Sequence, residues 1–167
     1  VSLADEIALK QYARDHGLLL MGPGAGTALL NGVALGFANA VPAGPVGIVS
    51  AAGTGLQEVS TLLARLGVGI TQGIGTGGRD LKQEVGGIMM LAAIRALQRD
   101  PATEVIVLIS KPPSDKVAAA ILAQAAGTNK PTVVCFMGTD TGDRAQLSAQ
   151  TLQEAAWLAA QASGTDI

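Results

Sequence analysis

The chain has 167 residues, enough for one domain that buries roughly two thirds of its unfolded surface, and its net charge is −2. Only 2% of its residues are aromatic and it is not basic, so it lacks the features that bind nucleic acid. Gly, Pro or charge interrupts every apolar run before the roughly 18 residues of a membrane span, so we expect no membrane partner either.

The first third of the chain is less regular than the rest. Leu3 to Asp15 has a helical pattern, and Leu18 to Met21 is a short apolar run typical of a strand. Residues 22–45 are rich in Gly and Pro, with one short apolar stretch at Val33 to Phe37. We expect residues 1–21 to be the tail of an upstream domain and residues 22–45 to be a linker that crosses into the next unit.

From Val46 onward, strand-like and helix-like segments alternate four times. Continuous apolar runs predict strands, and a period of three to four residues predicts helices. The predicted strands are 46–50, 69–74, 105–110 and 132–137. The predicted helices are one that begins near Thr54 with its apolar face at 56–66, one at 85–97, one with its apolar face at 117–125, and one at 152–162. Thr151 and Glu154 have capping-box spacing at the start of the last helix. This alternation predicts a three-layer α/β fold for residues 46–167, with a parallel sheet covered on both faces.

The first strand end from Val46 onward has the clearest chemistry. Ligands of open α/β sheets bind at the carboxyl ends of the strands. Here only small residues stand between the strand and the next helix, so a ligand can approach the backbone. The backbone N–H groups at the start of a helix attract anions. We predict a phosphate-binding turn formed by Ala52, Gly53, Thr54 and Gly55. The alternative is that Thr54 and Gln57 form a capping box and nothing binds.

The second strand end has the sequence GIGTGGRD, at residues 73–80. It matches GxGxxG, but no helix follows at once, and the nearest acidic residue about 20 positions on, Asp100, ends a predicted helix where a dinucleotide-binding fingerprint requires a strand end. We predict instead a phosphate-facing loop of Gly75, Thr76, Gly77 and Gly78, with Arg79 as a bidentate donor. The alternative is structural: Asp80 caps the next helix, and Arg79 pairs with solvent or a neighbouring acid.

Three further residues have side chains that often carry chemistry. Lys111 ends a buried strand before two prolines and can reach an anion as a point charge, unless it is only solvated. His16, the only histidine, precedes Gly17 at an expected helix C-terminus, and Cys135 lies in a predicted strand, so we interpret both as structural. The spacings of metal sites, nucleophile elbows and P-loops are not found in the sequence.

Several stretches carry a family resemblance that extends to about Met137. They are Gly22-Pro23, VGIVSAAGTGLQE, GIGTGGRDLKQEVGG and ATEVIVLISKPP. The chain resembles the α-subunit side of the succinyl-CoA synthetase and ADP-forming acyl-CoA synthetase superfamily, and the FdrA proteins in particular. The resemblance implies a flavodoxin-like, CoA-ligase-type domain over residues 46–167, preceded in residues 1–21 by the tail of a CoA-binding Rossmann domain. It also implies that the helix after SAAGT receives a phosphoryl group at its N-terminus.

The chain departs from this superfamily at the residues that relay phosphate. It has no Gly-His-Ala-type loop for a phosphorylated histidine, and Ser110-Lys111 stands where the ligases place a glutamate. The resemblance therefore favours a ligase or transferase domain that handles an acyl or carbamoyl phosphate with Arg79 and Lys111 as catalytic residues. FdrA-type proteins are associated with carbamoyl transfer to oxamate. CoA or ATP would bind only with domains absent from this chain.

The rival hypothesis is an assembly module of a larger enzyme. With 49% hydrophobic residues, we expect some apolar surface to be covered by other domains or subunits, and an oligomer to form. In that case the apolar helix 85–97 and the turns built of small residues pack against partner subunits. A single cysteine and no signal-peptide pattern predict a cytoplasmic protein, and the start without Met suggests a piece of a longer chain.

Overall fold

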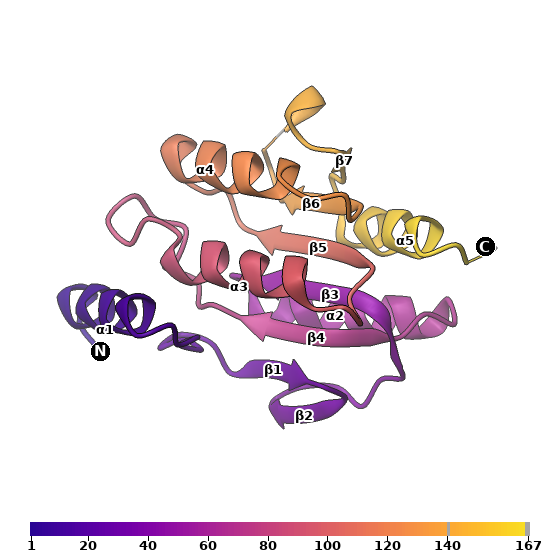
Figure 1. The fold of residues 1–167 in the computed structure, drawn as a ribbon, viewed down its shortest axis with the longest axis horizontal. Helices are drawn as coiled ribbons and strands as arrows, with labels where there is room; N and C mark the ends of the chain where they lie inside the picture. Colours follow the sequence, from indigo (N-terminus) through magenta and orange to yellow (C-terminus); the bar gives the residue numbers. More distant parts are fainter. Residues whose placement is uncertain (140, 166–167) are drawn as a thin grey trace.

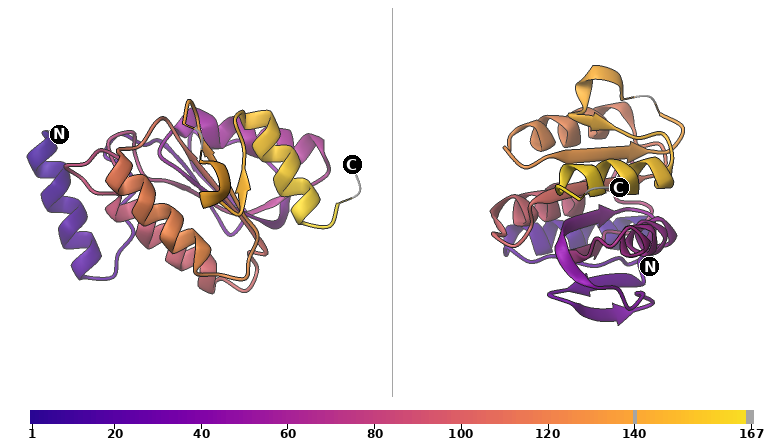
Figure 2. Two further views of the ribbon diagram at one scale, coloured as in Figure 1. Left: turned by 90° about the horizontal axis from the view of Figure 1, so that it is seen from above. Right: turned by 90° about the vertical axis from the view of Figure 1, so that its right-hand side faces the viewer.

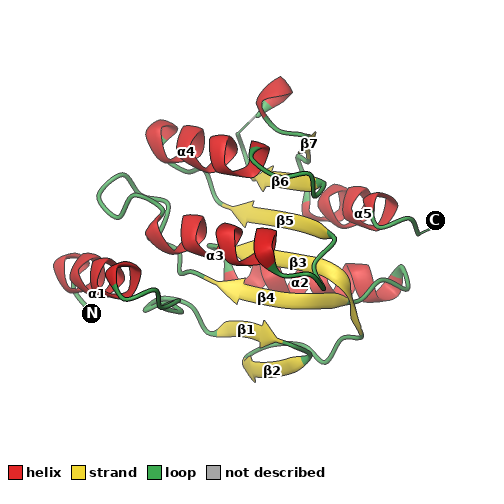
Figure 3. Cartoon of the chain, viewed as in Figure 1, coloured by secondary structure: helices red, strands yellow, loops and turns green. Residues whose placement is uncertain are grey.

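The computed structural model describes residues 1–139 and 141–165 and contains a single seven-stranded sheet (Figures 1 and 3). The elements in chain order are α1 (Leu3–Asp15), β1 (Thr27–Leu30), β2 (Val33–Gly36), β3 (Ala43–Ser50), α2 (Gly53–Arg65), β4 (Ile70–Gly75), α3 (Ile88–Arg99), β5 (Val105–Ser110), α4 (Asp115–Ala126), β6 (Thr132–Phe136), the 3-10 helix η1 (Gly142–Arg144), β7 (Leu147–Ser148) and α5 (Leu152–Ala162). No helix in this described part is long and apolar enough to cross a membrane.

The strand order is β2-β1-β4-β3-β5-β6-β7. Strands β4, β3, β5, β6 and β7 are parallel, while β1 and β2 form an antiparallel hairpin that extends the sheet beyond β4. The order of the five parallel strands is that of flavodoxin-like sheets, and the direction of winding changes between β3 and β5. The predicted three-layer α/β architecture is therefore confirmed, and the switch point lies where β3 and β5 end.

Helices cover both faces of the sheet (Figure 2). Helices α2 and α5 pack on one face and α3 and α4 on the other, around two separate clusters of buried apolar side chains. In β5, Val107 and Ile109 belong to the first cluster, and Ile106 and Leu108 to the second. Both faces of each central strand are thus buried, which explains the continuous apolar runs in the sequence.

The chain before β3 differs from the prediction. Leu18 to Met21 is irregular rather than a strand, because the hairpin occupies the neighbouring edge of the sheet and the Leu20 amide instead contacts the Met89 sulfur at 3.1 Å. Residues 22–45, expected to be a linker, contribute β1 and β2. The hairpin turn is Asn31-Gly32, with φ of 50° and 79°, and this dipeptide is a strong hairpin signal.

Candidate functional site

A cavity of about 410 Å³ lies at the switch point, above the ends of β3 and β5. It is lined by Gly24, Gly26, Thr27, Phe37, Ala51, Ala52, Gly53, Thr54, Gln57, Gly78, Ser110 and Lys111. Five residues predicted to bind phosphate or act on it are in this lining: Ala52, Gly53, Thr54, Gly78 and Lys111. Distant segments of the chain therefore meet at the place where α/β sheets of this order bind ligands.

The N-terminus of α2 opens into this cavity without a side-chain cap. The N-cap residue is Ala52, and no side chain bonds to the first turn. Gln57 does not form the capping box considered from the sequence, because its amide nitrogen donates to Thr27 Oγ1 at 2.9 Å. The first-turn N–H groups of α2 have no partners within the helix, so they and the positive end of the helix dipole are available to an anion.

Ser50 fixes the turn that leads into α2. Its hydroxyl donates to the Ala52 carbonyl at 2.6 Å and accepts from the Ala52 amide at 3.0 Å. Gly55, in the first turn, does not line the cavity: a Cβ there would stand 2.9 Å from Ile109 Cγ2. Gly55 therefore lets α2 approach β5 closely, while Ala52 to Thr54 face the cavity.

Most residues of the GTGG loop, at positions 75–78, serve packing and do not face the cavity. Only Gly78 of this loop lines the cavity. Gly75 packs against the Thr27 carbonyl, and Gly77, with φ of 93°, packs against the backbone of Gly22. Thr76 is fully buried, and its amide donates to the Ser50 carbonyl at 2.9 Å.

Arg79 and Asp80 take the structural roles that the sequence left open as alternatives. Arg79 Nε forms an ion pair with Glu6 Oε2 at 2.6 Å, and Arg79 Nη2 donates to the Val1 carbonyl at 3.1 Å, so the guanidinium faces α1 and not the cavity. Asp80 is fully buried and caps α3 by accepting from the amides of Met89 and Met90 at 3.3 and 2.8 Å.

Lys10 of α1 is the centre of a buried charge cluster that the sequence analysis did not find. Its side chain is 0% exposed, and Nζ lies 2.8 Å from Asp80 Oδ1, 3.0 Å from Glu6 Oε1 and 2.9 Å from the Thr76 carbonyl oxygen. The Glu6-Lys10 spacing suggests only an ordinary i,i+4 helix pair. Burial of that pair depends on Asp80, seventy positions along the chain.

The other members of the cavity were also not predicted. Ser110 is 3% exposed, and its hydroxyl makes no hydrogen bond with the described residues. Phe37 is 79% exposed and lies against Gly26, where a Cβ would stand 2.9 Å from Phe37 Cδ2. Recognising the Asn31-Gly32 hairpin would have placed Phe37 beside Gly26, but the pairing of β1 with β4, which brings both to the cavity, is a contact between distant segments.

Two residues interpreted as structural are confirmed as such. His16 is the C-cap residue of α1 and stacks on Tyr12, with ring centroids 3.9 Å apart. Cys135 is fully buried in β6, and burial, with a smaller effect from the charge of Glu154, raises the pKa of its thiol to about 11. The strand end after β6 includes Asp140, which lies outside the described residues.

Comparison with known proteins identifies a curated relative of similar sequence. The chain is 51% identical over 167 residues to the uncharacterized protein YahF of Escherichia coli (strain K12). The match covers 98% of this chain and 32% of YahF, so the chain spans about a third of that relative.

Solved structures share the fold. A dinucleotide-forming acetyl-coenzyme A synthetase 1 of Ca. Korarchaeum cryptofilum, in complex with phosphate and ADP, superposes with a TM-score of 0.69 at 17% identity, over 95% of this chain and 39% of that one. An ATP citrate lyase of Methanothrix soehngenii, in complex with citrate and coenzyme A, gives 0.68 at 23% identity, over 97% and 29%.

A family model provides the assignment. The model described as "CoA binding domain" matches residues 43–138, which run from the start of β3 to the turn after β6. This match covers more than half of the chain and includes the α2 N-terminus, Gly78 and Lys111. The chain therefore belongs to the CoA-binding domain family.

Proposed function

We propose that the chain is the phosphate-handling domain of an FdrA-like, cytoplasmic enzyme related to acyl-CoA synthetases. In this proposal the cavity at the switch point holds the phosphoryl group of an acyl phosphate or carbamoyl phosphate, without a phosphohistidine of its own. The observation that carries the proposal is the uncapped N-terminus of α2, open to a cavity of about 410 Å³ that Lys111 also lines.

The groups at the cavity suit an oxyanion better than a neutral ligand. The amides of Gly53 and Thr54 donate to phosphate oxygens, and Lys111 adds a positive charge from the end of β5. The Ser110 hydroxyl, which has no partner in the described chain, supplies a further donor. Arg79, predicted from the sequence as a second catalytic cation, is bound to Glu6, so in this proposal it acts on the ligand only by holding the loop that carries Gly78.

The domain division is part of the same proposal. Residues 46–167 would be the ligase-type domain, residues 22–45 the crossing segment, and residues 1–21 the tail of an upstream Rossmann domain. Because the CoA-binding family model matches residues 43–138, CoA would contact this chain itself, whereas ATP and the acceptor, such as oxamate in carbamoyl transfer, would meet the cavity through domains or subunits beyond it. Conservation of fold with the acetyl-coenzyme A synthetase and the ATP citrate lyase supports an enzyme of this general type.

The proposal is tested by removing a single backbone N–H donor from the cradle, by which we mean the turn of residues 52–54 at the N-terminus of α2. Gly53 is the first residue of α2, where proline fits a helix, and Ala52 before it is already extended (φ −123°, ψ 105°). A Cβ at Gly53 meets only Thr27, at 3.4 Å or more. We expect Gly53→Pro to keep the fold and to weaken binding of carbamoyl phosphate or inorganic phosphate, measured by isothermal titration calorimetry, by at least about tenfold.

Asp115→Pro is the matched control, because Asp115 is the exposed first residue of α4, outside the cavity lining. It removes a negative charge, so it should not weaken anion binding. Equal binding by the wild type and Gly53→Pro would refute the cradle. CoA and ATP serve as further ligands: tight binding of CoA with no response to carbamoyl phosphate would move the proposal from phosphorylated carbonyl compounds to CoA itself.

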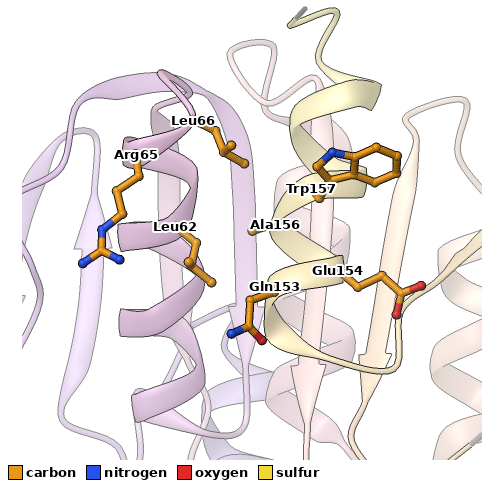
Figure 4. A pocket seen from close by; sticks show the side chains of 7 residues that line it. All are labelled: Leu62, Arg65, Leu66, Gln153, Glu154, Ala156 and Trp157. Carbon is orange, nitrogen blue, oxygen red and sulfur yellow. The ribbon is translucent and has the colours of Figure 1, made fainter. Parts of the chain in front are cut away.

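A second candidate function, an assembly module, rests on a groove between α2 and α5 (Figure 4). The groove has a volume of about 410 Å³, and Leu62, Leu66, Ala156 and Trp157 provide its apolar wall. Trp157 is 46% exposed. The apolar helix 85–97, which the sequence suggested as the packing surface, corresponds to α3. It is not available to a partner, because it buries Met90, Ile94 and its other apolar residues against the sheet. Apolar surface of this kind is common at protein contacts.

Sedimentation velocity separates the two candidates. If the chain is an assembly module, Trp157→Lys should lower its self-association and leave anion binding intact, whereas Gly53→Pro should change neither. If the first proposal is correct, Gly53→Pro should weaken ligand binding at unchanged mass.

A further inference from the structure

We propose that a second cavity, between α1 and α3, binds a small phosphorylated molecule that carries at least two negative charges. The cavity has a volume of about 300 Å³. It is lined by Arg14, Gly17, Leu18, Leu19, Ala92, Arg95, Ala96 and Arg99. None of these residues lines the cavity at the switch point, so this inference goes beyond the proposed function.

Three guanidinium groups meet at this cavity, and no carboxylate is among its lining residues. Arg95 and Arg99 are one helical turn apart on α3, where like charges repel each other. Neither forms an ion pair or a side-chain hydrogen bond with the described residues. Arg14 shares only its Nε with Asp15, at 2.8 Å, and both of these side chains are at least half exposed. A chain with a net charge of −2 thus gathers three positive charges at one hollow, and among the described residues only Arg14 has a carboxylate partner.

Helix dipoles explain part of this charge but not all of it. Arg14 and Arg99 lie in the last turns of α1 and α3, where the dipole favours a cation. Arg95 lies before the last turn of α3 and is half-buried, so the dipole does not account for it. The cost of placing it beside Arg99 would be offset by an anion bound between them.

The shape of the cavity indicates a small organic phosphate. Gly17, with φ of 67°, turns the chain away from α1. The side chains of Ala92 and Ala96 are small and so leave space for a ligand against α3. A volume of about 300 Å³ is at the lower end for ligand sites. Guanidinium groups bind phosphate in a bidentate manner, and three of them match a multiply charged ligand. Leu18 and Leu19, which are 55% and 47% exposed, provide apolar contact for the rest of such a molecule.

The experiment titrates the chain with inorganic pyrophosphate at low salt and follows the Nε–Hε signals of the arginines by NMR. We expect the signals of Arg95 and Arg99 to shift. The Arg95→Gln/Arg99→Gln double variant should weaken binding at this site by at least about tenfold, because two charge-assisted contacts are lost. Arg65→Gln is the matched control, since Arg65 is an exposed arginine in the last turn of α2 and should leave binding unchanged.

Three results would overturn the inference. Signal shifts confined to residues 52–55 would place pyrophosphate at the α2 N-terminus alone. An equal loss of affinity with Arg65→Gln would show a general charge effect. Succinate binding as tightly as pyrophosphate would point to dicarboxylates. Repeating the titration with Gly53→Pro separates the sites. Arg95 and Arg99 should still shift in that variant even if the cradle proposal fails.

Discussion

Gly53 and Gly55 are two positions apart in the first turn of α2, but they are small for different reasons. A Cβ at Gly53 would meet only Thr27, at 3.4 Å or more, so the backbone there stays open to a ligand. A Cβ at Gly55 would press on Ile109 at 2.9 Å, so that glycine serves the packing of α2 on β5. Both fit an anion-binding turn in the sequence, and only the positions of Thr27 and Ile109 distinguish them.

Lys111 is the side chain at the cavity that most directly tests the electrostatic part of the proposal. It is exposed, so its contribution should be modest, and Lys111→Gln should weaken phosphate binding by up to about fivefold. The effect should nearly vanish at about 1 M salt, where the Debye length is about 3 Å. Titration calorimetry at low and high salt measures both. Lys116→Gln, an exposed lysine of α4 outside the cavity, is the control, and an equal loss there would contradict a specific role for Lys111.

Cys135 gives a prediction on pH. Burial raises the pKa of its thiol from 9.0 to about 11, so the folded chain keeps a proton that the unfolded chain has already lost. Because the folded state binds more protons in this range, the free energy of unfolding should fall as pH rises from about 9 to about 11. Urea titrations of the wild type and Cys135→Ala measure this, with the other titrating groups common to both. A slope equally steep in Cys135→Ala would contradict the assignment.

At the scale of elements, local signals predicted most of the fold. The predicted bounds of α1, β5 and α5 agree with the structure, because each depends on an uninterrupted pattern or on a cap such as Thr151, whose hydroxyl accepts from the Glu154 amide at 3.1 Å. The β1–β2 hairpin was missed although Asn31-Gly32 signals it and apolar residues stand on both sides of that turn, because the Gly and Pro content of residues 22–45 favours a linker. Lys10 and Asp80 could not have been paired from sequence, because their contact depends on how α1 meets α3.

A chain of hydrogen bonds links α1 to the α2 cradle. Lys10 donates to the Thr76 carbonyl at 2.9 Å, the Thr76 amide donates to the Ser50 carbonyl at 2.9 Å, and the Ser50 hydroxyl bonds to both polar groups of Ala52. The conformation of the cradle is thus tied to a buried ammonium on a different helix. This link makes Lys10 a positioning residue for the proposed ligand.

Lys10→Met tests this link. The variant leaves Asp80 buried without its cation and Glu6 with only Arg79 as a partner, so the free energy of unfolding should fall by about 3–5 kcal/mol. Adding Glu6→Gln and Asp80→Asn removes the unpaired charges and should recover much of that loss. It does not restore the bond to Thr76, so phosphate binding by the triple variant should remain weaker than in the wild type. Chemical denaturation and titration calorimetry on the same samples measure the two effects.

Lys130→Met is the control for a lysine that only supports the fold. Lys130 donates to the carbonyls of Leu97 and Asp100 at 2.8 and 2.6 Å, at the C-terminus of α3 and far from the cradle in the hydrogen-bond network. It should lose stability and keep phosphate affinity. Normal phosphate binding by the folded triple variant would show that Lys10 stabilises the fold without positioning the cradle.

For the whole molecule, the sheet separates two apolar cores. One lies under α2 and α5 and the other under α3 and α4, and β5 contributes to both with alternate side chains. The cavity at the switch point lies where the strands end, beyond both cores. Such an arrangement lets the ligand site vary while the packing on each face stays intact.

The separation of the cores leads to a prediction on additivity. Ile70 and Ile94 are each 0% exposed, one in each core, and each change to valine should lower the free energy of unfolding by about 0.5–1.5 kcal/mol. Because the side chains share no cluster, the double variant should lose the sum to within about 0.5 kcal/mol. The urea dependence should be unchanged, since both cores unfold in one transition. Urea denaturation of the four proteins measures this, and an interaction energy above about 1 kcal/mol would mean that the sheet transmits packing changes between its faces.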